Sequence, residues 1–230
     1  MSKLAINEAE LPAGLVALPI RTRLVARGDD LAELIAGATA GMLNKEDVVA
    51  VSETAVAIAQ GRFVGAEYIR PSPLAYALAR QAGALATMSQ PESVQLVIDQ
   101  VGTKRVLGAV AAHIAGRLRG KRGVFYEQLG DAIATIDGYT GTMAPYEQAI
   151  VFGPNDPDAF ARTCAERIGA GCAVVDANDL RIAKVLGASE GVSRDAVARA
   201  LLSNPHGNSD QQTPLVILKW RGAGKSPLWQ

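Results

Sequence analysis

The sequence Gly171-Cys-Ala-Val-Val-Asp176-Ala-Asn178-Asp179 places a short apolar run directly before two carboxylates and a carboxamide. A glycine before the run and turn-forming residues after it predict a buried strand over Cys172 to Val175. In open α/β sheets, ligands bind beyond the carboxyl ends of such strands. We therefore expect Asp176, Asn178 and Asp179 to lie at a ligand-binding edge of a sheet.

The three oxygen-bearing side chains suit a hard cation. Mg²⁺ and Mn²⁺ take carboxylate oxygens and commonly share their ligand shell with phosphate. In an alternative interpretation, Asp176 and Asn178 form an Asx turn and Asp179 caps the segment that follows. This segment alone leaves both interpretations open.

The composition predicts a large hydrophobic core and a balanced surface. Of the 230 residues, 49% are hydrophobic, and 23 basic residues match 23 acidic ones. This balance argues against nucleic acid as a partner. The first residues lack the apolar region of a secretory signal and no long apolar span follows, which predicts a cytoplasmic protein without membrane contact. Cys164 and Cys172, the two cysteines, are expected to be buried small hydrophobes.

Alternating strand and helix patterns predict a mixed α/β fold. Predicted strands cover 15–20, 48–51, 124–127, 132–136, 149–152, 172–175 and 215–219, and predicted helices cover 31–38, 55–60, 74–86, 91–101, 157–168 and 194–202. The apolar run 106–114 is expected to be buried. We expect one unit over 1–230, with a division into two subdomains near the prolines at 70–73 as an alternative.

Three further stretches carry candidate ligand groups. Arg117, Arg119, Lys121 and Arg122 lie between glycines, where four cations suit phosphates or a polyanionic substrate. A solvated surface loop is the alternative.

The second stretch is Asp137-Gly-Tyr-Thr140-Gly-Thr142, at the end of a predicted strand. Its glycines permit close backbone approach to a ligand, and the threonine hydroxyls suit phosphate or metal, although a simple turn has the same composition. The third is the polar loop 203–214, in which His206 is a candidate phosphate contact or proton carrier and Asn208 a candidate substrate contact. A solvated histidine is the alternative there.

Several of these pieces, in this order, resemble the γ-glutamyl ligases that add glutamate to the deazaflavin coenzyme F-420. The matching pieces are Leu18-Pro19-Ile20, Gly28-Asp-Asp-Leu31, Asp47-Val-Val-Ala-Val-Ser52 with Gly61-Arg62, Ile136-Asp137, Gly153-Pro-Asn-Asp-Pro157 and Val174-Val-Asp176. The most specific of them is Gly28-Asp-Asp-Leu31, and together they extend over most of the chain.

The resemblance implies a mixed-sheet fold, an intertwined dimer and a reaction that uses GTP and two divalent metal ions. The substrate would accept a phosphoryl group, and the glutamate amine would displace it from the activated end. The resemblance assigns Asp137 and Asp176 to the metals, and Ser52 to the nucleotide. Pro19 and Thr22 follow as nucleotide contacts beside the first strand, together with Thr140 and Thr142.

The chain departs from the family pattern at Glu53, where the family has a lysine, and at Ala177, where it has a threonine. GTP and ATP both remain candidate co-substrates. The departures leave a second function open, a non-catalytic nucleotide- or metabolite-binding protein that keeps the fold. A nucleic-acid-associated protein that uses the basic loop is a third hypothesis, which the zero net charge disfavours.

Overall fold

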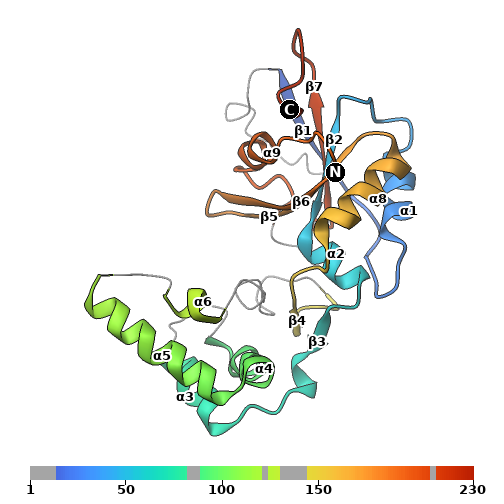
Figure 1. Ribbon diagram of the computed structural model, residues 1–230. Helices are drawn as coiled ribbons and strands as arrows, with labels where there is room; N and C mark the ends of the chain where they lie inside the picture. Colours follow the sequence, from blue (N-terminus) through green and yellow to red (C-terminus); the bar gives the residue numbers. More distant parts are fainter. Residues whose placement is uncertain (1–13, 82–88, 121–123, 130–143, 208–210) are drawn as a thin grey trace. The chain divides into compact units, whose positions relative to one another are not determined.

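The computed structural model describes residues 14–81, 89–120, 124–129, 144–207 and 211–230 (Figure 1). The chain divides into two compact units. Residues 1–61 and 154–230 contribute to the first, which we call the sheet unit, and residues 62–153 to the second, the helical unit. The second unit is thus an insertion in the first.

A five-stranded mixed sheet forms the centre of the sheet unit, which confirms the predicted mixed α/β class. In spatial order it consists of β1 (Leu15–Ile20), β7 (Leu215–Trp220), β2 (Val48–Ser52), β5 (Gly171–Asn178) and β6 (Ile182–Ala188). Within this sheet β2 and β5 are parallel, and the other neighbouring pairs are antiparallel. The central strands read as continuous apolar runs because both of their faces are covered.

Helices lie on both sides of this sheet (Figure 1). Helices α1 (Leu31–Thr39) and α8 (Pro157–Ile168) lie on one side and α9 (Arg194–Ala200) on the other, while α2 (Glu53–Ala59) follows β2 directly. Helices α1, α8 and α9 each begin after a residue whose side chain caps the helix. The side chains of Asp30, Asp156 and Ser193 accept the backbone N–H three residues later.

Alternation along the strands separates two core layers. Val48 and Ala50 of β2 pack with Val197 and Leu201 beside α9, whereas the intervening Val49, although fully buried, is not part of that cluster. Cys164 of α8 and Cys172 of β5 are both free and buried. The hydrogen bond with Cys164 and then burial raise the pKa of the Cys172 thiol. Both cysteines are buried and free, as expected of small hydrophobic residues.

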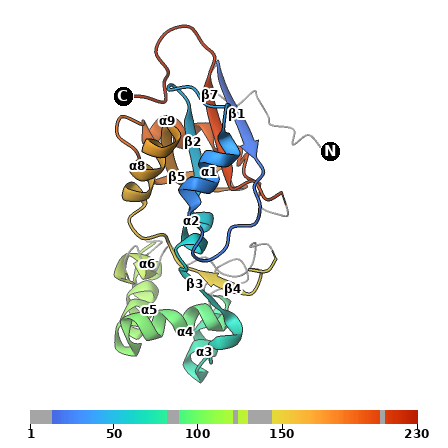
Figure 2. The same ribbon diagram turned by 90° about the vertical axis from the view of Figure 1, so that its right-hand side faces the viewer.

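The helical unit is built on a short antiparallel strand pair, with its helices grouped beside it (Figure 2). Strand β3 (Phe63–Gly65) pairs with β4 (Ala149–Val151). The remaining elements are the 3₁₀ turn η2 (Ala66–Tyr68) and the helices α3 (Pro73–Gln81), α4 (Pro91–Val101), α5 (Thr103–Leu118) and α6 (Val124–Leu129). Ala75, Val97, Val106 and Ile150 contribute to one buried cluster from α3, α4, α5 and β4.

Hydrogen bonds join the chain segments where the insertion leaves and re-enters the sheet unit. The Gln60 side-chain Nε2 donates to the Asn155 carbonyl at 3.0 Å, and the Asn155 N–H donates to Gln60 Oε1 at 2.7 Å. On the insertion's own side, Arg62 Nε donates to the Gly153 carbonyl, and the Phe152 N–H donates to the Arg62 carbonyl. The two ends of the inserted segment therefore lie next to each other.

Two predictions of local structure are wrong. Residues 124–127, predicted as a strand from their β-branched and aromatic side chains, lie in α6. The run 106–114 is helical but only partly buried, because Leu107 and Ile114 of α5 are 46% and 57% exposed. The predicted strand 132–136 lies outside the described residues. Within the described part of the chain, no helix is long and apolar enough to cross a membrane.

Candidate active site at the carboxyl edge of the sheet

Strands β1, β2 and β5 run in the same direction, so their carboxyl ends meet at one edge of the sheet. In the strand register Leu215 of β7 pairs with both Ile20 and Val51, and Ser52 pairs with Val175. The residues that follow this row, among them Thr22 and Asp176, therefore gather at one edge, where α/β sheets bind ligands.

Pro19 and Thr22 lie at the exit of β1. Pro19 pairs with Val216 on an edge strand, a position that tolerates the missing N–H of proline. The Thr22 N–H donates to the Gln212 carbonyl at 3.1 Å, and its hydroxyl donates to the Arg23 carbonyl at 2.7 Å. The backbone of Thr22 is thus fixed by the loop that precedes β7.

Ser52 ends β2 and begins α2. Its N–H donates to the Pro214 carbonyl at 2.8 Å, and its hydroxyl makes no cap bond within the described residues. Glu53 opens the helix where the family pattern has a lysine, so a carboxylate replaces a cation in the first turn.

Asp176 lies within β5, which continues beyond the predicted end at Val175 as far as Asn178. Ala173, Val175 and Ala177 pack in the core beside α9, so the alternating Asp176 faces the other side of the sheet. Desolvation raises the pKa of the half-buried Asp176 carboxyl, and the charge of Lys184, opposite it on β6, opposes that shift. A cation beside Asp176 would stabilise its ionised form.

Asn178 and Asp179 form the tight turn between β5 and β6. Asn178 Oδ1 accepts the N–H groups of Leu180 at 3.0 Å and Ile182 at 3.3 Å, which is the Asx turn that the sequence offered as an alternative. Asp179 Oδ1 accepts a hydrogen bond from Asn204 Nδ2 at 2.8 Å. The side chains of Asn178 and Asp179 therefore have hydrogen-bond partners within the protein. The carboxyl of Asp176 is half-buried, with the charge of Lys184 nearby.

His206 is buried rather than solvated, with 8% of its surface exposed. Its Nδ1 lies 3.0 Å from the Thr213 carbonyl oxygen, and a carbonyl only accepts, so Nδ1 carries the proton. Burial lowers the pKa of His206 to about 4. The ring is neutral at neutral pH and lacks the charge that a cationic phosphate contact requires.

The remaining predicted residues lie elsewhere. Arg117 is exposed in the last turn of α5 and Arg119 is its C-cap, both in the helical unit. Cations at a helix C-terminus complement the helix dipole, which gives these two arginines a local role. Asp137, Thr140, Thr142, Lys121, Arg122 and Asn208 lie outside the described residues.

A cleft of about 500 Å³ lies between the segment that leaves β1 and helix α1. Its volume is in the range of small-molecule sites. The lining residues are Arg21, Thr22, Arg23, Asp30, Glu33, Leu34, Gly37 and Ala38. The sequence patterns single out Thr22 but neither arginine, because basic residues just after a strand are a common surface feature.

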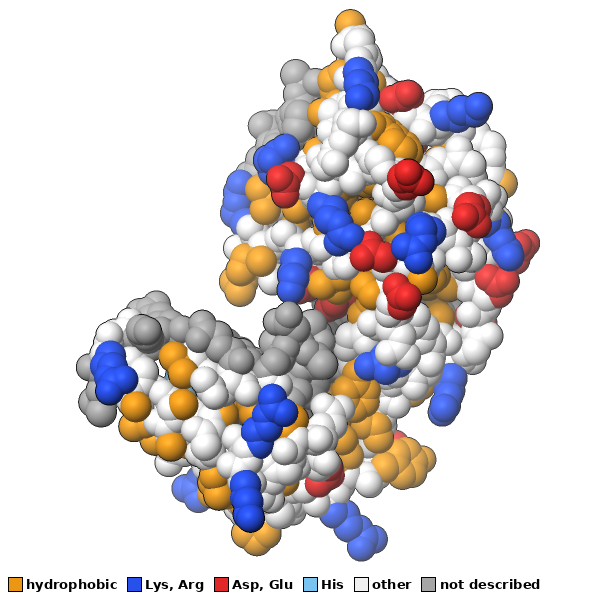
Figure 3. All heavy atoms as spheres, viewed as in Figure 1, with side chains coloured by type: hydrophobic (Ala, Val, Ile, Leu, Met, Phe, Trp, Pro, Cys, Tyr) orange, Lys and Arg blue, Asp and Glu red, His pale blue; other side chains and the backbone are white. Residues whose placement is uncertain are grey.

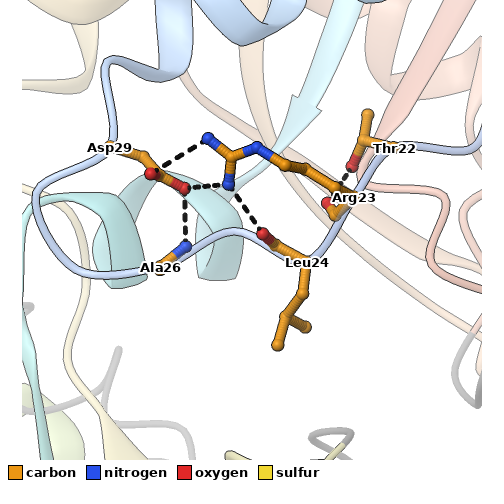
Figure 4. Close-up of polar contacts among 5 residues, drawn as sticks. All are labelled: Thr22, Arg23, Leu24, Ala26 and Asp29. Atoms are coloured by element: carbon orange, nitrogen blue, oxygen red, sulfur yellow. Dashed lines mark hydrogen bonds and ion pairs between the residues drawn. The ribbon is translucent and has the colours of Figure 1, made fainter.

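An ion pair between Arg23 and Asp29 lies beside this cleft (Figure 4). Arg23 makes two bonds to the Asp29 carboxylate, of 2.6 and 3.0 Å, and Asp29 Oδ2 also accepts the Ala26 N–H. The guanidinium of Arg23 holds the pKa of Asp29 below its ordinary value. Asp30, the cap of α1, also pairs with Arg167 of α8 at 3.1 Å. Asp29 and Asp30 of Gly28-Asp-Asp-Leu31 thus have structural partners beside the cleft.

Positive and negative side chains are intermixed on the surface of the sheet unit. On the face of the sheet unit visible in Figure 3, Lys and Arg side chains alternate with Asp and Glu. Among the ion pairs of this unit, Arg167 contacts Glu33 at 2.9 Å and Asp30 at 3.1 Å. Such mixed charge gives local ion pairs and a weak overall field.

Among the described side chains at this edge, Asp176 is the candidate metal ligand. No group of three His, Cys, Asp or Glu residues suited to a metal ion occurs in the described part of the chain. Mg²⁺ needs fewer protein ligands than such a group, because it keeps several waters and binds through one or two carboxylates and substrate phosphates. Asp176, with its desolvated carboxyl, fits that requirement as one ligand.

Comparison with known proteins agrees with this arrangement. The sequence profile of a family described as "F420-0:Gamma-glutamyl ligase" matches residues 19–182. The chain is also 32% identical over 146 residues to the "Coenzyme F420:L-glutamate ligase" of Methanopyrus kandleri. That alignment covers 64% of this chain and 50% of the relative, so the chain spans half the relative's length.

The profile match begins at Pro19 in β1, continues through both units and ends at Ile182, the first residue of β6. It therefore includes Thr22, Ser52 and Asp176 at the sheet edge. The chain belongs to the F420-0:gamma-glutamyl ligase family.

Proposed function

We propose that this protein is a nucleotide- and divalent-metal-dependent γ-glutamyl ligase that forms an amide bond on a phosphate-bearing or carboxylate metabolite. The observation that carries the proposal is that Thr22, Ser52 and Asp176 lie along one edge of the sheet, within the segment that matches the family. The name of the Methanopyrus kandleri relative supports the choice of glutamate as the added group.

In this proposal the nucleotide lies beside the β1 exit and the cleft next to α1. Thr22 contributes its side chain there, and Ser52 at the start of α2 contributes a hydroxyl that no helix cap uses. Asp176 holds Mg²⁺ or Mn²⁺, which supplies charge neutralisation for the transferred phosphoryl group. Asp137, Thr140 and Thr142 keep the roles that the resemblance implies.

Thermal stability with GTP or ATP, each with and without Mn²⁺, tests the proposal. A ligand that binds only the folded state at 100 times its Kd stabilises it by about 2.7 kcal/mol, which is a Tm increase of roughly 5–10 °C for a chain of this size. We expect a metal-dependent increase that Asp176→Asn abolishes. Asp195→Asn, at an exposed position of α9, is the matched control and should keep it.

The ligand-free Tm of Asp176→Asn adds a second check. Because burial disfavours the ionised carboxyl of Asp176, the neutral amide should leave the ligand-free Tm unchanged or higher. A lower ligand-free Tm together with a retained Mn²⁺ effect would contradict a metal role for Asp176. Transfer of labelled glutamate to a carboxylate acceptor, with release of phosphate, then tests catalysis itself.

A second function, nucleotide or metabolite binding without catalysis, has one specific support. Glu53 stands where the family has a lysine, next to Ser52, and removes a cation from the proposed nucleotide site. Binding without turnover in the same experiments would favour it. The proposal also includes a homodimer, which a solution mass of twice the chain mass would support.

A further inference from the structure

The loop between α9 and β7 connects three segments that carry candidate site residues. Its Gln212 carbonyl accepts the Thr22 N–H, and its Pro214 carbonyl accepts the Ser52 N–H. Near its other end, Asn204 Nδ2 donates to Asp179 Oδ1. One loop therefore contacts the exits of β1 and β2 and the turn after β5.

Two reciprocal hydrogen bonds close this loop. His206 Nδ1–H donates to the Thr213 carbonyl, and the Thr213 hydroxyl donates to the His206 carbonyl. Both residues are buried, with 8% and 7% of their surfaces exposed. The His206–Thr213 pair thus ties the end that holds Asp179 to the end that holds Thr22 and Ser52.

The backbone at Gln212, next to this pair, does not adopt its shape by local preference. Its φ angle is 53°, in the left-handed region that a glutamine rarely occupies, whereas Asn204, with a φ of 47°, is of a residue type enriched there. Such residues persist where the surrounding contacts determine the conformation. The His206–Thr213 bonds involve the residue that directly follows Gln212, and they are buried contacts that help to determine this conformation.

The second ring nitrogen of His206 does not explain its burial. With the proton on Nδ1, Nε2 is an acceptor, and it has no hydrogen-bond partner within the described residues. A neutral ring has no electrostatic attraction for phosphate. Within the described residues, the hydrogen bond of the His206 ring is the one from Nδ1.

We propose that His206 and Thr213 are positioning residues, which hold the loop so that its two carbonyls fix Thr22 and Ser52 and its Asn204 fixes Asp179. The geometric part stands on the hydrogen bonds alone. That the positioned residues bind a nucleotide and metal rests on the proposed function. The experiment separates the two parts.

Paired substitutions distinguish the two ring nitrogens. The amide nitrogen of His206→Asn takes the place of Nδ1 and keeps the donor to the Thr213 carbonyl, whereas His206→Gln keeps a polar group near Nε2 and loses that donor. Thr213→Ser keeps the hydroxyl, and Thr213→Val removes it. Should His206→Gln fail to fold, Thr213→Val carries the same test with a smaller change.

Amide hydrogen exchange, measured by NMR without any ligand, tests the geometric part. We expect the Thr22 and Ser52 amides to exchange about tenfold faster or more in His206→Gln and Thr213→Val, because each hydrogen bond to the loop opens more often. They should stay protected in His206→Asn and Thr213→Ser. The Val49 amide, in the middle of β2, should not change in any folded variant. Equal exchange of Thr22 and Ser52 in all variants would overturn the proposal.

Affinity for GTP or ATP with Mn²⁺, by calorimetry, tests the functional part. We expect His206→Gln and Thr213→Val to weaken binding about tenfold, which is about 1.4 kcal/mol, with His206→Asn and Thr213→Ser close to the parent chain. Loss of binding in His206→Asn with intact amide protection would show that Nε2 contacts the ligand, and would overturn the inference that His206 affects binding only by positioning the loop. If the parent chain binds neither nucleotide, the proposed function fails while the exchange result still decides the role of the pair.

Discussion

Desolvation favours the neutral form of two side chains near the sheet edge, His206 and Asp176, but their surroundings differ. His206 has a fixed donor bond and 8% exposure. Asp176 is half-buried, and the cation of Lys184 lies opposite it on β6. His206 is therefore suited to stay neutral and hold backbone, whereas Asp176 is suited to bind a cation that completes its charge balance.

The depressed pKa of His206 makes the free energy of unfolding depend on pH. The folded-state pKa is about 4, below the ordinary value of about 6.5. Above pH 6.5 the ring is neutral in both states. As the pH falls below 6.5, the unfolded chain binds a proton that the folded chain does not, so stability decreases.

Urea unfolding at pH 7 and pH 5 measures this effect. We expect His206 to contribute a loss of about 2 kcal/mol at pH 5. Carboxylates add their own pH dependence, so the quantity to compare is the difference between the parent chain and His206→Asn. An equal loss in both proteins would mean that His206 is protonated in the folded state at pH 5.

Single residues are predictable from the sequence where their contacts are local. The caps at Asp30 and Asp156 are of this kind, because each accepts the backbone N–H of a residue three positions away. Gln212 could not be found in this way, because its partners Arg21 and Thr22 are about 190 positions distant and its side chain carries no motif. The sequence predicts that the strand ends at Val175, but β5 continues through Asp176 because pairing with β6 extends the strand.

At the scale of elements, strong end signals gave accurate boundaries. Helix α4 begins at Pro91 and is followed by Gly102, and its observed bounds match the prediction. Residues 124–129 lack such signals, and this segment forms a helix next to α5 rather than a strand. Strand β6 was not predicted, because Ile182–Ala188 has no regular alternation and contains a glycine.

That glycine, Gly187, sets the approach of α8 to β6. A Cβ at this position would lie 2.2 Å from the Pro157 carbonyl carbon and 2.4 Å from its oxygen. Asp158 reinforces the contact, because its Oδ1 accepts the Ala188 N–H at 2.8 Å and pairs with Arg194. If the first turn of α8 moved away from β6, the bonds of Asp158 to Ala188 and Arg194 would be lost.

We expect Gly187→Ala to lower the free energy of unfolding by about 1–3 kcal/mol, because backbone atoms must shift to accept the methyl group. Gly108→Ala is the matched control. Gly108 is exposed within α5 with nothing near its Cβ position, and the substitution should stabilise by about 0.5–1 kcal/mol through helix propensity. Urea denaturation of both variants measures the pair. A neutral Gly187→Ala would mean that α8 can move away from β6 at little cost.

At the scale of the whole molecule, the inserted unit begins and ends at adjacent points. The reciprocal bonds between Gln60 and Asn155 belong to the sheet unit and do not depend on the residues between 62 and 153. The five strands and their flanking helices also come entirely from the sheet unit. The sheet unit thus contains a complete core of its own.

We therefore expect the sheet unit to fold when residues 62–153 are replaced by a short glycine-serine linker between Gly61 and Pro154. Unfolding in urea, followed by far-ultraviolet circular dichroism, should remain a single cooperative transition. Breaking the Gln60–Asn155 bonds with Gln60→Ala should lower the stability of the shortened chain. A broad, non-cooperative transition would show that the sheet unit depends on the insertion.

Both tryptophans of the chain lie in the sheet unit. The Trp220 indole donates to the Gly224 carbonyl, and the Trp229 indole donates to the Glu46 carbonyl. The Trp229 ring lies beside Gly171. Tryptophan fluorescence therefore reports on the sheet unit alone. Far-ultraviolet circular dichroism also reports on the helices of the helical unit. Recording both signals in one titration would resolve the order in which the two units melt without attaching any dye.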